Sequence, residues 1–216
     1  MKQTLVHHIW RLIFKTFRRK RFAQFVDRIQ PQPHERILDI GGYPATWEGH
    51  EQIAAEIHIV NVHAITPPAD PGHFRFQVAD GCALPFADQS FDIVFSNSVI
   101  EHVGDFERQK AFAAEVIRTG RRLWVQTPAQ EFWIEPHFMT PFIHWLPKSW
   151  QHRLTRNFSI WGWLTRPDAQ QVAAFIGDIR LLTHAEMVQL FPGCEILREK
   201  VCLGLFTKSY IAVKTL

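Results

Sequence analysis

The chain has 216 residues, of which 46% are hydrophobic and 21% are charged. This length suits one α/β domain with at most a modest extension, and the composition excludes general disorder because it can supply a core. The formal net charge is only +3, and the one dense group of basic residues lies between Arg11 and Arg21. A nucleic-acid-binding protein would spread basic residues over a larger surface, so we do not expect one here.

The spacing of the cysteines and the length of the apolar runs indicate in which cellular compartment the protein works. Cys82, Cys194 and Cys202 form no Cys-x-x-Cys pair and have no metal-ligand spacing to a histidine, so we expect free thiols under reducing conditions. No apolar run approaches the roughly 20 residues that cross a bilayer, and charges interrupt the apolar N-terminus, unlike a signal peptide. We predict a cytoplasmic protein, with peripheral membrane contact as the alternative.

Residues 3–29 show the periodicity of an amphipathic helix, in one piece or two. The basic run Arg18–Arg21 separates two apolar stripes that are rotated relative to each other. Pro31 ends the pattern, because proline and the residue before it both resist helical geometry. We therefore divide the chain into an N-terminal helix, residues 1–30, and a main domain, residues 31–216.

Short apolar runs alternate with helical patterns along the main domain. This alternation predicts an α/β fold with an open, mostly parallel sheet, in which the final strand pair adds one antiparallel strand at or near an edge. The seven predicted strands are Arg36–Ile40, Glu56–Val60, Phe74–Val78, Phe91–Phe95, Leu123–Gln126, Glu195–Val201 and Ser209–Val213. The predicted helices are Phe106–Ile117, with Phe106, Ala113 and Ile117 facing inward, Pro167–Ile179 and Thr183–Leu190.

An aromatic-rich insertion, residues 128–166, follows the fifth predicted strand. It contains five of the eight tryptophans and is divided by prolines at 128, 136, 141 and 147. Such a segment predicts small fold elements of its own rather than a flexible linker. It could bind a substrate, act as a packed cap or form a dimer interface, and the sequence leaves these alternatives open.

Glycines or polar residues follow each of the first four predicted strands. They are Asp39–Gly42, Asn61, Asp80–Cys82 and Ser96–Ser98, in chain order. Ligands of open parallel sheets bind outside the carboxyl ends of the strands, so we expect these groups to line one pocket. The turn after the first strand lacks the glycine spacings that cradle phosphates. The pattern therefore favours a nucleoside ligand without phosphates, of which S-adenosylmethionine is one.

Four consecutive motifs resemble those of the Rossmann-like, or class I, S-adenosylmethionine-dependent methyltransferases. The resemblance covers roughly residues 35–127 and 180–214, and its strength lies in the spacing of several elements. It implies a Rossmann-like open, mostly parallel seven-stranded sheet and transfer of a methyl group from S-adenosylmethionine. The motifs are Ile37–Gly42, Ala79–Phe86, Ser90–Val94 and Val99–Val103.

The same resemblance implies a role for each residue at the strand ends. Asp39 and the backbone of Gly41, Gly42 and Tyr43 would hold the amino-acid end of the cofactor. Asn61 would meet the ribose hydroxyls. The adenine would lie against Asp80, Gly81 and Cys82. Asn97 and His102 would lie near the sulfonium and the acceptor.

Two positions depart from the family pattern. Tyr43 and Ala45 stand where the family usually has more glycines, and Asn61 stands where it usually has Asp or Glu. A neutral amide binds a hydroxyl less strongly than a carboxylate does, so these changes bear on cofactor affinity more than on the fold.

Three residues are candidates for the chemistry of the acceptor. His102 follows the fourth strand, and Glu135 and His137 flank Pro136 just beyond the fifth. A hydroxyl acceptor benefits from a nearby base, which either histidine could supply. We expect the segment around His137 to face the acceptor and to touch the cofactor little. We expect no metal site, because the 12 histidines include no close sequence pair beside a suitable carboxylate.

Several alternatives stay open at this level. The acceptor is a small molecule, a glycan or a lipid-linked compound, methylated on oxygen or nitrogen. The helix of residues 3–29 could lie on an anionic membrane, cover the cofactor site or form a homodimer contact. Two rival functions are a cofactor-binding protein without turnover and a membrane-docked assembly factor.

Overall fold

The sheet at the centre of the protein has seven strands. The computed structural model describes residues 18–215. The strand order is β3-β2-β1-β4-β5-β9-β8, in which the first five strands pair in parallel and β9 is antiparallel to both β5 and β8. This confirms the predicted α/β, mostly parallel fold. The strands are β1 (Arg36–Ile40), β2 (Glu56–Asn61), β3 (Phe74–Val78), β4 (Phe91–Asn97), β5 (Gly120–Pro128), β8 (Glu195–Val201) and β9 (Phe206–Lys214).

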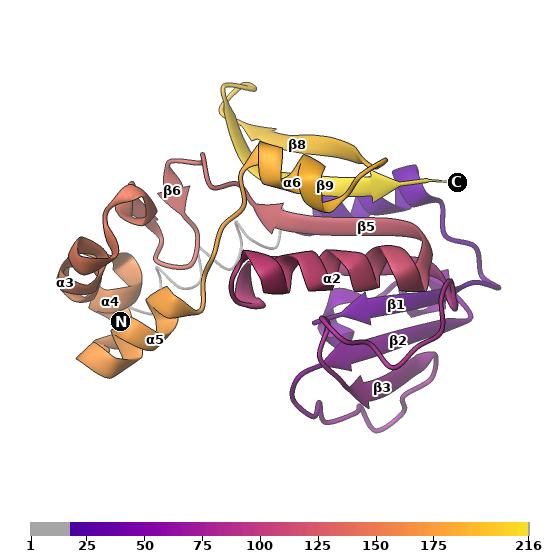
Figure 1. The fold of residues 1–216 in the computed structure, drawn as a ribbon. Helices are drawn as coiled ribbons and strands as arrows, with labels where there is room; N and C mark the ends of the chain where they lie inside the picture. The colour runs from indigo at the N-terminus through magenta and orange to yellow at the C-terminus, as the bar shows by residue number, and fades with distance from the viewer. Residues whose placement is uncertain (1–17, 216) are drawn as a thin grey trace.

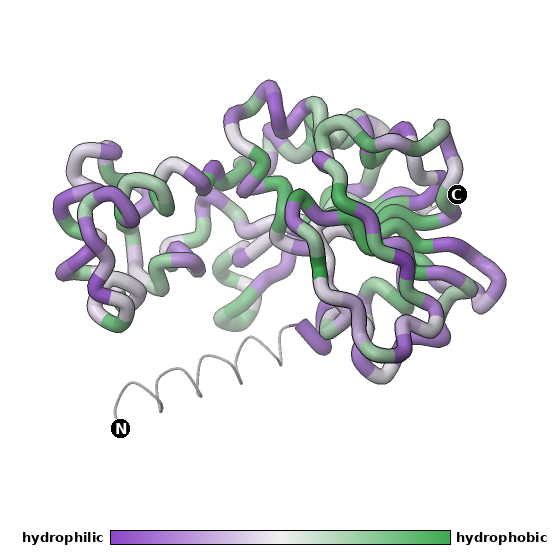
Figure 2. Tube along the Cα trace, turned by 90° about the horizontal axis from the view of Figure 1, so that it is seen from below, coloured by the Kyte–Doolittle hydropathy of each residue, from purple (hydrophilic) through white to green (hydrophobic). Residues whose placement is uncertain are grey.

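Helices cover both faces of the sheet. One face packs against residues 18–29, which are helical, through the buried side chains of Phe25 and Ile29. The other face packs against α2 (Phe106–Thr119) and α6 (His184–Leu190), as Figure 1 shows for α2 in front of the strands. Figure 2 shows the hydrophobic residues gathered along the strands between hydrophilic loops.

The face that α2 turns inward differs slightly from the predicted one. Ala113 is buried as expected, but Phe106 and Ile117 are only half-buried. The fully buried positions near the middle of the helix are Gln109 and Phe112. A polar residue can occupy this place because the Gln109 amide donates to the backbone carbonyls of Ile100 and Arg180, which a pattern of apolar residues alone does not reveal.

The N-terminal helix ends where the prolines predict, at residue 29. The buried Arg122 guanidinium donates to the Ile29 carbonyl at 2.6 Å, which satisfies one of the free carbonyls at the end of the helix. The second apolar stripe packs on the sheet. The first stripe lies in residues 1–17, outside the described residues, so the membrane and dimer contacts assigned to residues 3–29 stay predictions.

The insertion forms a small unit beyond the ends to which β1, β2 and β5 point (Figure 1). Its core is separate from that of the sheet and includes Phe138, Ile143, Val172 and Ile176. The packed unit therefore continues past residue 166. Its elements are the hairpin β6 (Ile134–Glu135) and β7 (Thr140–Pro141), and the helices α3 (Lys148–Phe158), α4 (Ile160–Thr165) and α5 (Ala169–Gly177).

The two ends of the insertion lie side by side at the sheet. Ala129 and Leu182 form a parallel bridge, and the Gln130 N–H donates to the Leu182 carbonyl at 3.0 Å. The chain thus leaves and rejoins the sheet at nearly the same place. Within residues 18–215, no helix is both long and apolar enough to cross a membrane.

Candidate functional site

The turn after β1 admits only glycine at two positions. Gly41 has φ +73°, and a Cβ there would lie 2.5 Å from Val99 Cγ2. A Cβ on Gly42 would lie 1.8 Å from Asp39 Oδ2. The backbone after β1 is therefore tightly folded against its own strand, and both glycines are needed for that path.

Asp39 is buried beneath this turn, with 1% of its surface exposed. Trp47 Nε1 donates to Asp39 Oδ2 at 2.7 Å. Burial raises the pKa of Asp39 from 3.8 to about 7, and the hydrogen bond from Trp47 opposes that rise. The carboxyl group predicted to hold the amino-acid end of the cofactor thus lies beneath the turn, while the neighbouring Tyr43 is exposed.

The carboxyl ends of β3, β2, β1 and β4 lie in a row, in that order. This brings Asp80, Asn61, the Gly41–Gly42 turn and Asn97 to one edge of the sheet. Gly81 lies against the α2 face of the sheet, since a Cβ there would lie 2.9 Å from the Phe112 ring. The predicted cofactor residues therefore share one edge of the sheet.

Asp80 is held in place by two hydrogen bonds. Its Oδ1 accepts from the Cys82 N–H at 2.9 Å, and its Oδ2 accepts from Arg108 Nη2 at 2.7 Å. The bond from Arg108, followed by that from Cys82, lowers the pKa of Asp80. Each carboxylate oxygen can accept a second bond, so Asp80 is a fixed anion that can still receive an amino group.

Arg21 joins the N-terminal helix to the far end of the row. Its Nη1 donates to Asn97 Oδ1 at 2.7 Å and to Gln126 Oε1 at 2.8 Å, and its Nη2 lies 3.0 Å from Glu199 Oε2. Burial raises the pKa of Glu199, but the charges of Arg21 and Lys208 more than offset this and hold it below its ordinary value. The helix therefore covers the ends of β4 and β5, a contact that the basic run in the sequence does not predict.

A cluster of histidines and carboxylates stands beyond β4. The rings of His102 and His137 meet edge to face with centroids 4.9 Å apart. His102 Nδ1 lies 3.0 Å from Asp178 Oδ2, and His137 Nδ1 lies 2.6 Å from Glu135 Oε1. Glu135 is fully buried and also accepts from a backbone N–H at 2.6 Å. Each ring is thus oriented by its own carboxylate.

Glu101 forms the floor of this cluster. It is fully buried, and its Oε2 accepts from Thr127 Oγ1 at 2.9 Å, but its Oε1 has no hydrogen-bond partner in the described part of the chain. Burial raises the pKa of Glu101, and the nearby His137 and His102 oppose the rise. Burial lowers the pKa of His137, but the bond to Glu135 and the surrounding carboxylates raise it more, so the net direction is upward.

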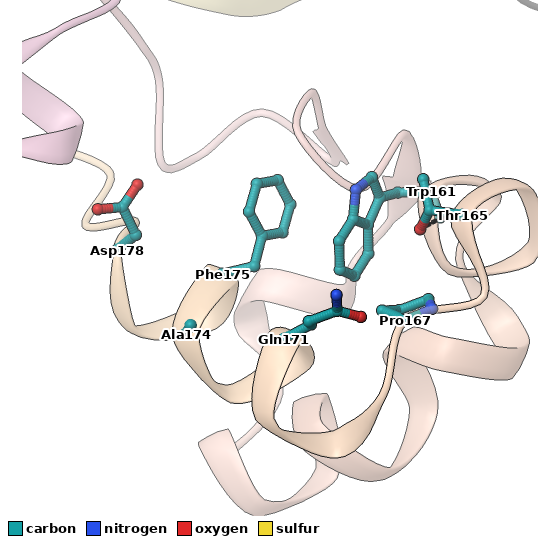
Figure 3. A pocket seen from close by; sticks show the side chains of 7 residues that line it. All are labelled: Trp161, Thr165, Pro167, Gln171, Ala174, Phe175 and Asp178. Carbon is teal, nitrogen blue, oxygen red and sulfur yellow. Dashed lines mark hydrogen bonds between the residues drawn. The ribbon is translucent and has the colours of Figure 1, made fainter. Parts of the chain in front are cut away.

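An open depression of about 520 Å³ adjoins the cluster between α4 and α5. Figure 3 shows Asp178 at one end and Thr165 and Pro167 at the other, with Trp161 and Phe175 between them. The Trp161 and Phe175 rings stack at 4.4 Å. Because Asp178 also bonds to His102, this aromatic surface leads directly to the histidine cluster.

The structure brings the three predicted catalytic residues, His102, Glu135 and His137, into one cluster. Two further members, Glu101 and Asp178, are absent from the predicted set. Glu101 could have been found, because it directly precedes His102 in the short turn Ile100–His102 that follows β4. Asp178 lies 76 positions from His102, and no local pattern links the two.

Comparisons with known proteins agree with this fold. The methyltransferase-domain family model matches residues 49–123. An uncharacterized methyltransferase of Mycobacterium marinum is 34% identical over 106 residues, which cover 46% of this chain and 40% of that protein. An O-methyltransferase of Pyrenophora dematioidea is 30% identical over 117 residues, which cover 46% and 42%. The chain thus spans about 40% of the length of these curated relatives.

A solved structure extends the likeness over almost the whole chain. Magnesium protoporphyrin IX methyltransferase of Synechocystis PCC 6803, with bound S-adenosylhomocysteine, has a TM-score of 0.57 and 14% identity, and covers 97% of this chain and 87% of its own. At that identity the likeness concerns the fold. The matched domain, the relatives and the sheet order agree: residues 49–123 match a methyltransferase-domain family, and the chain has the Rossmann-like fold of S-adenosylmethionine-dependent methyltransferases.

Proposed function

We propose that this protein transfers the methyl group of S-adenosylmethionine, the cofactor of its family, to a hydroxyl group of an acceptor held at the histidine cluster. The observation that carries the proposal is that cluster. Two histidines, each oriented by a carboxylate, lie beyond β4, next to the row of predicted cofactor residues. The O-methyltransferase among the relatives supports an oxygen acceptor.

The cofactor would lie along the row of strand ends. Its adenine would meet Asp80, Gly81 and Cys82, and its ribose would meet Asn61. The amino-acid end would follow the backbone of Gly41, Gly42 and Tyr43 above Asp39. The sulfonium would then stand near Asn97, whose amide oxygen is already fixed by Arg21.

The reaction is an in-line displacement at the methyl carbon. The acceptor oxygen forms a bond to that carbon, the carbon–sulfur bond breaks, and its electron pair stays on sulfur in S-adenosylhomocysteine. The protein's work is positioning and help with the acceptor proton. The histidines can lower the cost of deprotonation by accepting the proton themselves or by holding a cation that polarises the hydroxyl.

The aromatic depression between α4 and α5 would receive the rest of the acceptor. The Trp161 and Phe175 rings offer an apolar floor beside the charged Asp178. This lining suits a small molecule, glycan or lipid-linked compound with an apolar face and a hydroxyl group. Such a pocket, mostly apolar with a few polar groups, is typical of small-molecule sites.

The experiment that tests the proposal is mass spectrometry of cell extracts incubated with the protein and methyl-labelled S-adenosylmethionine. A labelled product with a methyl ether is expected. Titration calorimetry with S-adenosylhomocysteine separates the rival, a binding protein without turnover, which would give heat but no labelled product. If millimolar S-adenosylhomocysteine gives no heat and no thermal shift, both the methyltransferase function and the binding-protein alternative are rejected.

The Asp80→Ala variant should bind S-adenosylhomocysteine about 5- to 150-fold more weakly, or about 1–3 kcal/mol, since a buried polar group of the ligand loses its partner. Calorimetry on the folded variant measures this. Arg108→Ala is the matched control, because it breaks the same ion pair but keeps the Asp80 carboxylate as a hydrogen-bond acceptor for the ligand. Equal losses in the two variants would mean that Asp80 acts only through Arg108.

The Asn61→Asp variant should bind S-adenosylhomocysteine as well as the wild type or more tightly. A carboxylate at the end of β2 would make charge-assisted bonds to the ribose hydroxyls. The same titration measures the effect. A loss of tenfold or more would show that Asn61 does not face the ribose.

A further inference from the structure

Three potential metal ligands converge at the histidine cluster. Among residues 18–215, Glu101, His102 and His137 each offer one ligand atom, and these atoms lie within 4.8 Å of one another. Ligands at about 2.0–2.2 Å from a shared ion stand up to roughly 4 Å apart, so small side-chain movements bring all three into range. No ion is present in the structure.

The surroundings of both histidines are those of metal ligands. Nδ1 of His102 is hydrogen-bonded to Asp178, and Nδ1 of His137 is hydrogen-bonded to Glu135. A neutral histidine that donates from Nδ1 to a carboxylate carries its lone pair on Nε2. Metal-binding histidines are usually oriented by such a carboxylate, which fixes the tautomer and raises the basicity of the ring.

Glu101 supplies the observation that points to a missing ligand. Its carboxylate is fully buried, yet Oε1 has no hydrogen-bond partner within residues 18–215. A buried carboxylate oxygen without a donor carries a large desolvation cost. Thr127 satisfies only the other oxygen. A cation between Glu101 and the two rings would offset that cost.

We propose that Glu101, His102 and His137 bind one divalent transition-metal ion of the Zn²⁺ class, with at least one coordination position open to the acceptor hydroxyl. This rests on the function proposed above. Two imidazole nitrogens favour such an ion over Mg²⁺ or Ca²⁺, which prefer oxygen ligands. Three protein ligands leave room for a further group, as at catalytic rather than structural sites.

The ion would act on the acceptor without changing its own oxidation state. The hydroxyl oxygen binds the open position, its acidity rises, and its proton passes to solvent water. The metal-bound oxygen then attacks the methyl carbon as the carbon–sulfur bond breaks. In this arrangement the histidines act as ligands, and Glu135 and Asp178 are positioning residues.

Titration of the chelator-treated full chain with Co²⁺ tests the site through visible absorption, followed by displacement with Zn²⁺. One Co²⁺ per chain is expected, with a spectrum of low coordination number and weak competition by Mg²⁺. His102→Ala and Glu101→Gln should each lose the spectrum. Asp178→Ala, which removes a positioning residue, should weaken binding by about 10–100-fold.

His152→Ala is the control for non-specific binding, because His152 is an exposed histidine of α3. It should bind Co²⁺ as the wild type does. Glu101→Gln removes a buried charge and could disturb folding, but His102 is partly exposed, so His102→Ala keeps the test valid. An unchanged spectrum in His102→Ala, or no saturable binding by the wild type, overturns the metal site.

The experiments distinguish failure of the metal site from failure of the methyltransferase function. Binding of S-adenosylhomocysteine by the chelated protein, without binding of Co²⁺, rejects the metal site and leaves the methyltransferase function standing. Binding of Co²⁺ without binding of S-adenosylhomocysteine rejects the methyltransferase function.

Discussion

The His137→Ala variant should lower the turnover number of methyl transfer by about 10²–10⁴-fold, equivalent to about 2.7–5.5 kcal/mol in the barrier. His137 is held by the buried Glu135 and faces His102. Its loss therefore removes a group that would either accept the acceptor proton or help to hold the cation that makes this proton more acidic. The affinity for S-adenosylhomocysteine should stay within about twofold. Incorporation of labelled methyl and calorimetry measure the two quantities.

Two comparisons make this result specific. His152→Ala should leave both quantities unchanged, because that side chain is exposed on α3. His102→Ala should disturb both if its ring stands beside the sulfonium. A His137→Ala variant that turns over normally would remove His137 from the site, and one that binds S-adenosylhomocysteine much more weakly would place it against the cofactor.

The Asp39→Asn variant should be more stable than the wild type, and the gain should grow with pH. The pKa of Asp39 rises from 3.8 to about 7 through burial. Between these values the unfolded chain releases a proton that the folded chain retains, so the wild type loses stability as pH rises. Above pH 7 the full cost is about 4 kcal/mol. Asparagine can keep the bond from Trp47 without a charge.

Urea denaturation at pH 5 and pH 8 measures this effect. The gain from Asp39→Asn should be about 2–3 kcal/mol larger at pH 8 than at pH 5, since about two pH units of the interval lie below the folded pKa. Asp27→Asn, at an exposed position of the N-terminal helix, is the matched control. An equal gain at both values of pH would show that Asp39 is ionised in the folded protein throughout.

Most of the sheet could be predicted from the sequence because each strand is a local apolar run with a breaker at its end. The run Arg36–Ile40 followed by two glycines is one example, and the structure begins and ends β1 at the predicted residues. Strand β5 is longer than predicted, since Arg122 lies within it. Its guanidinium donates from Nη1 to the Ile29 carbonyl and forms an ion pair with Glu35, and both partners are far away in sequence.

The site was harder to predict, for a similar reason. His102, Glu135 and His137 carry recognisable chemistry close to strand ends. Asp178 does not, because its partner comes from a different part of the chain. In the sequence, Arg21 is the last residue of the basic run Arg18–Arg21, and nothing near it indicates a partner. In the folded protein its guanidinium is buried among Asn97, Gln126 and Glu199, a setting that only the tertiary structure creates.

The neighbouring ends of the insertion have a consequence for how such proteins diversify. Because Ala129 and Leu182 are bridged, the sheet needs only two adjacent attachment points, and the unit between them has a core of its own. Recombination at these two attachment points could replace the whole insertion in one step and leave the seven strands of the sheet unchanged. Acceptor preference could therefore evolve by exchange of a module, faster than substitution of single residues would allow.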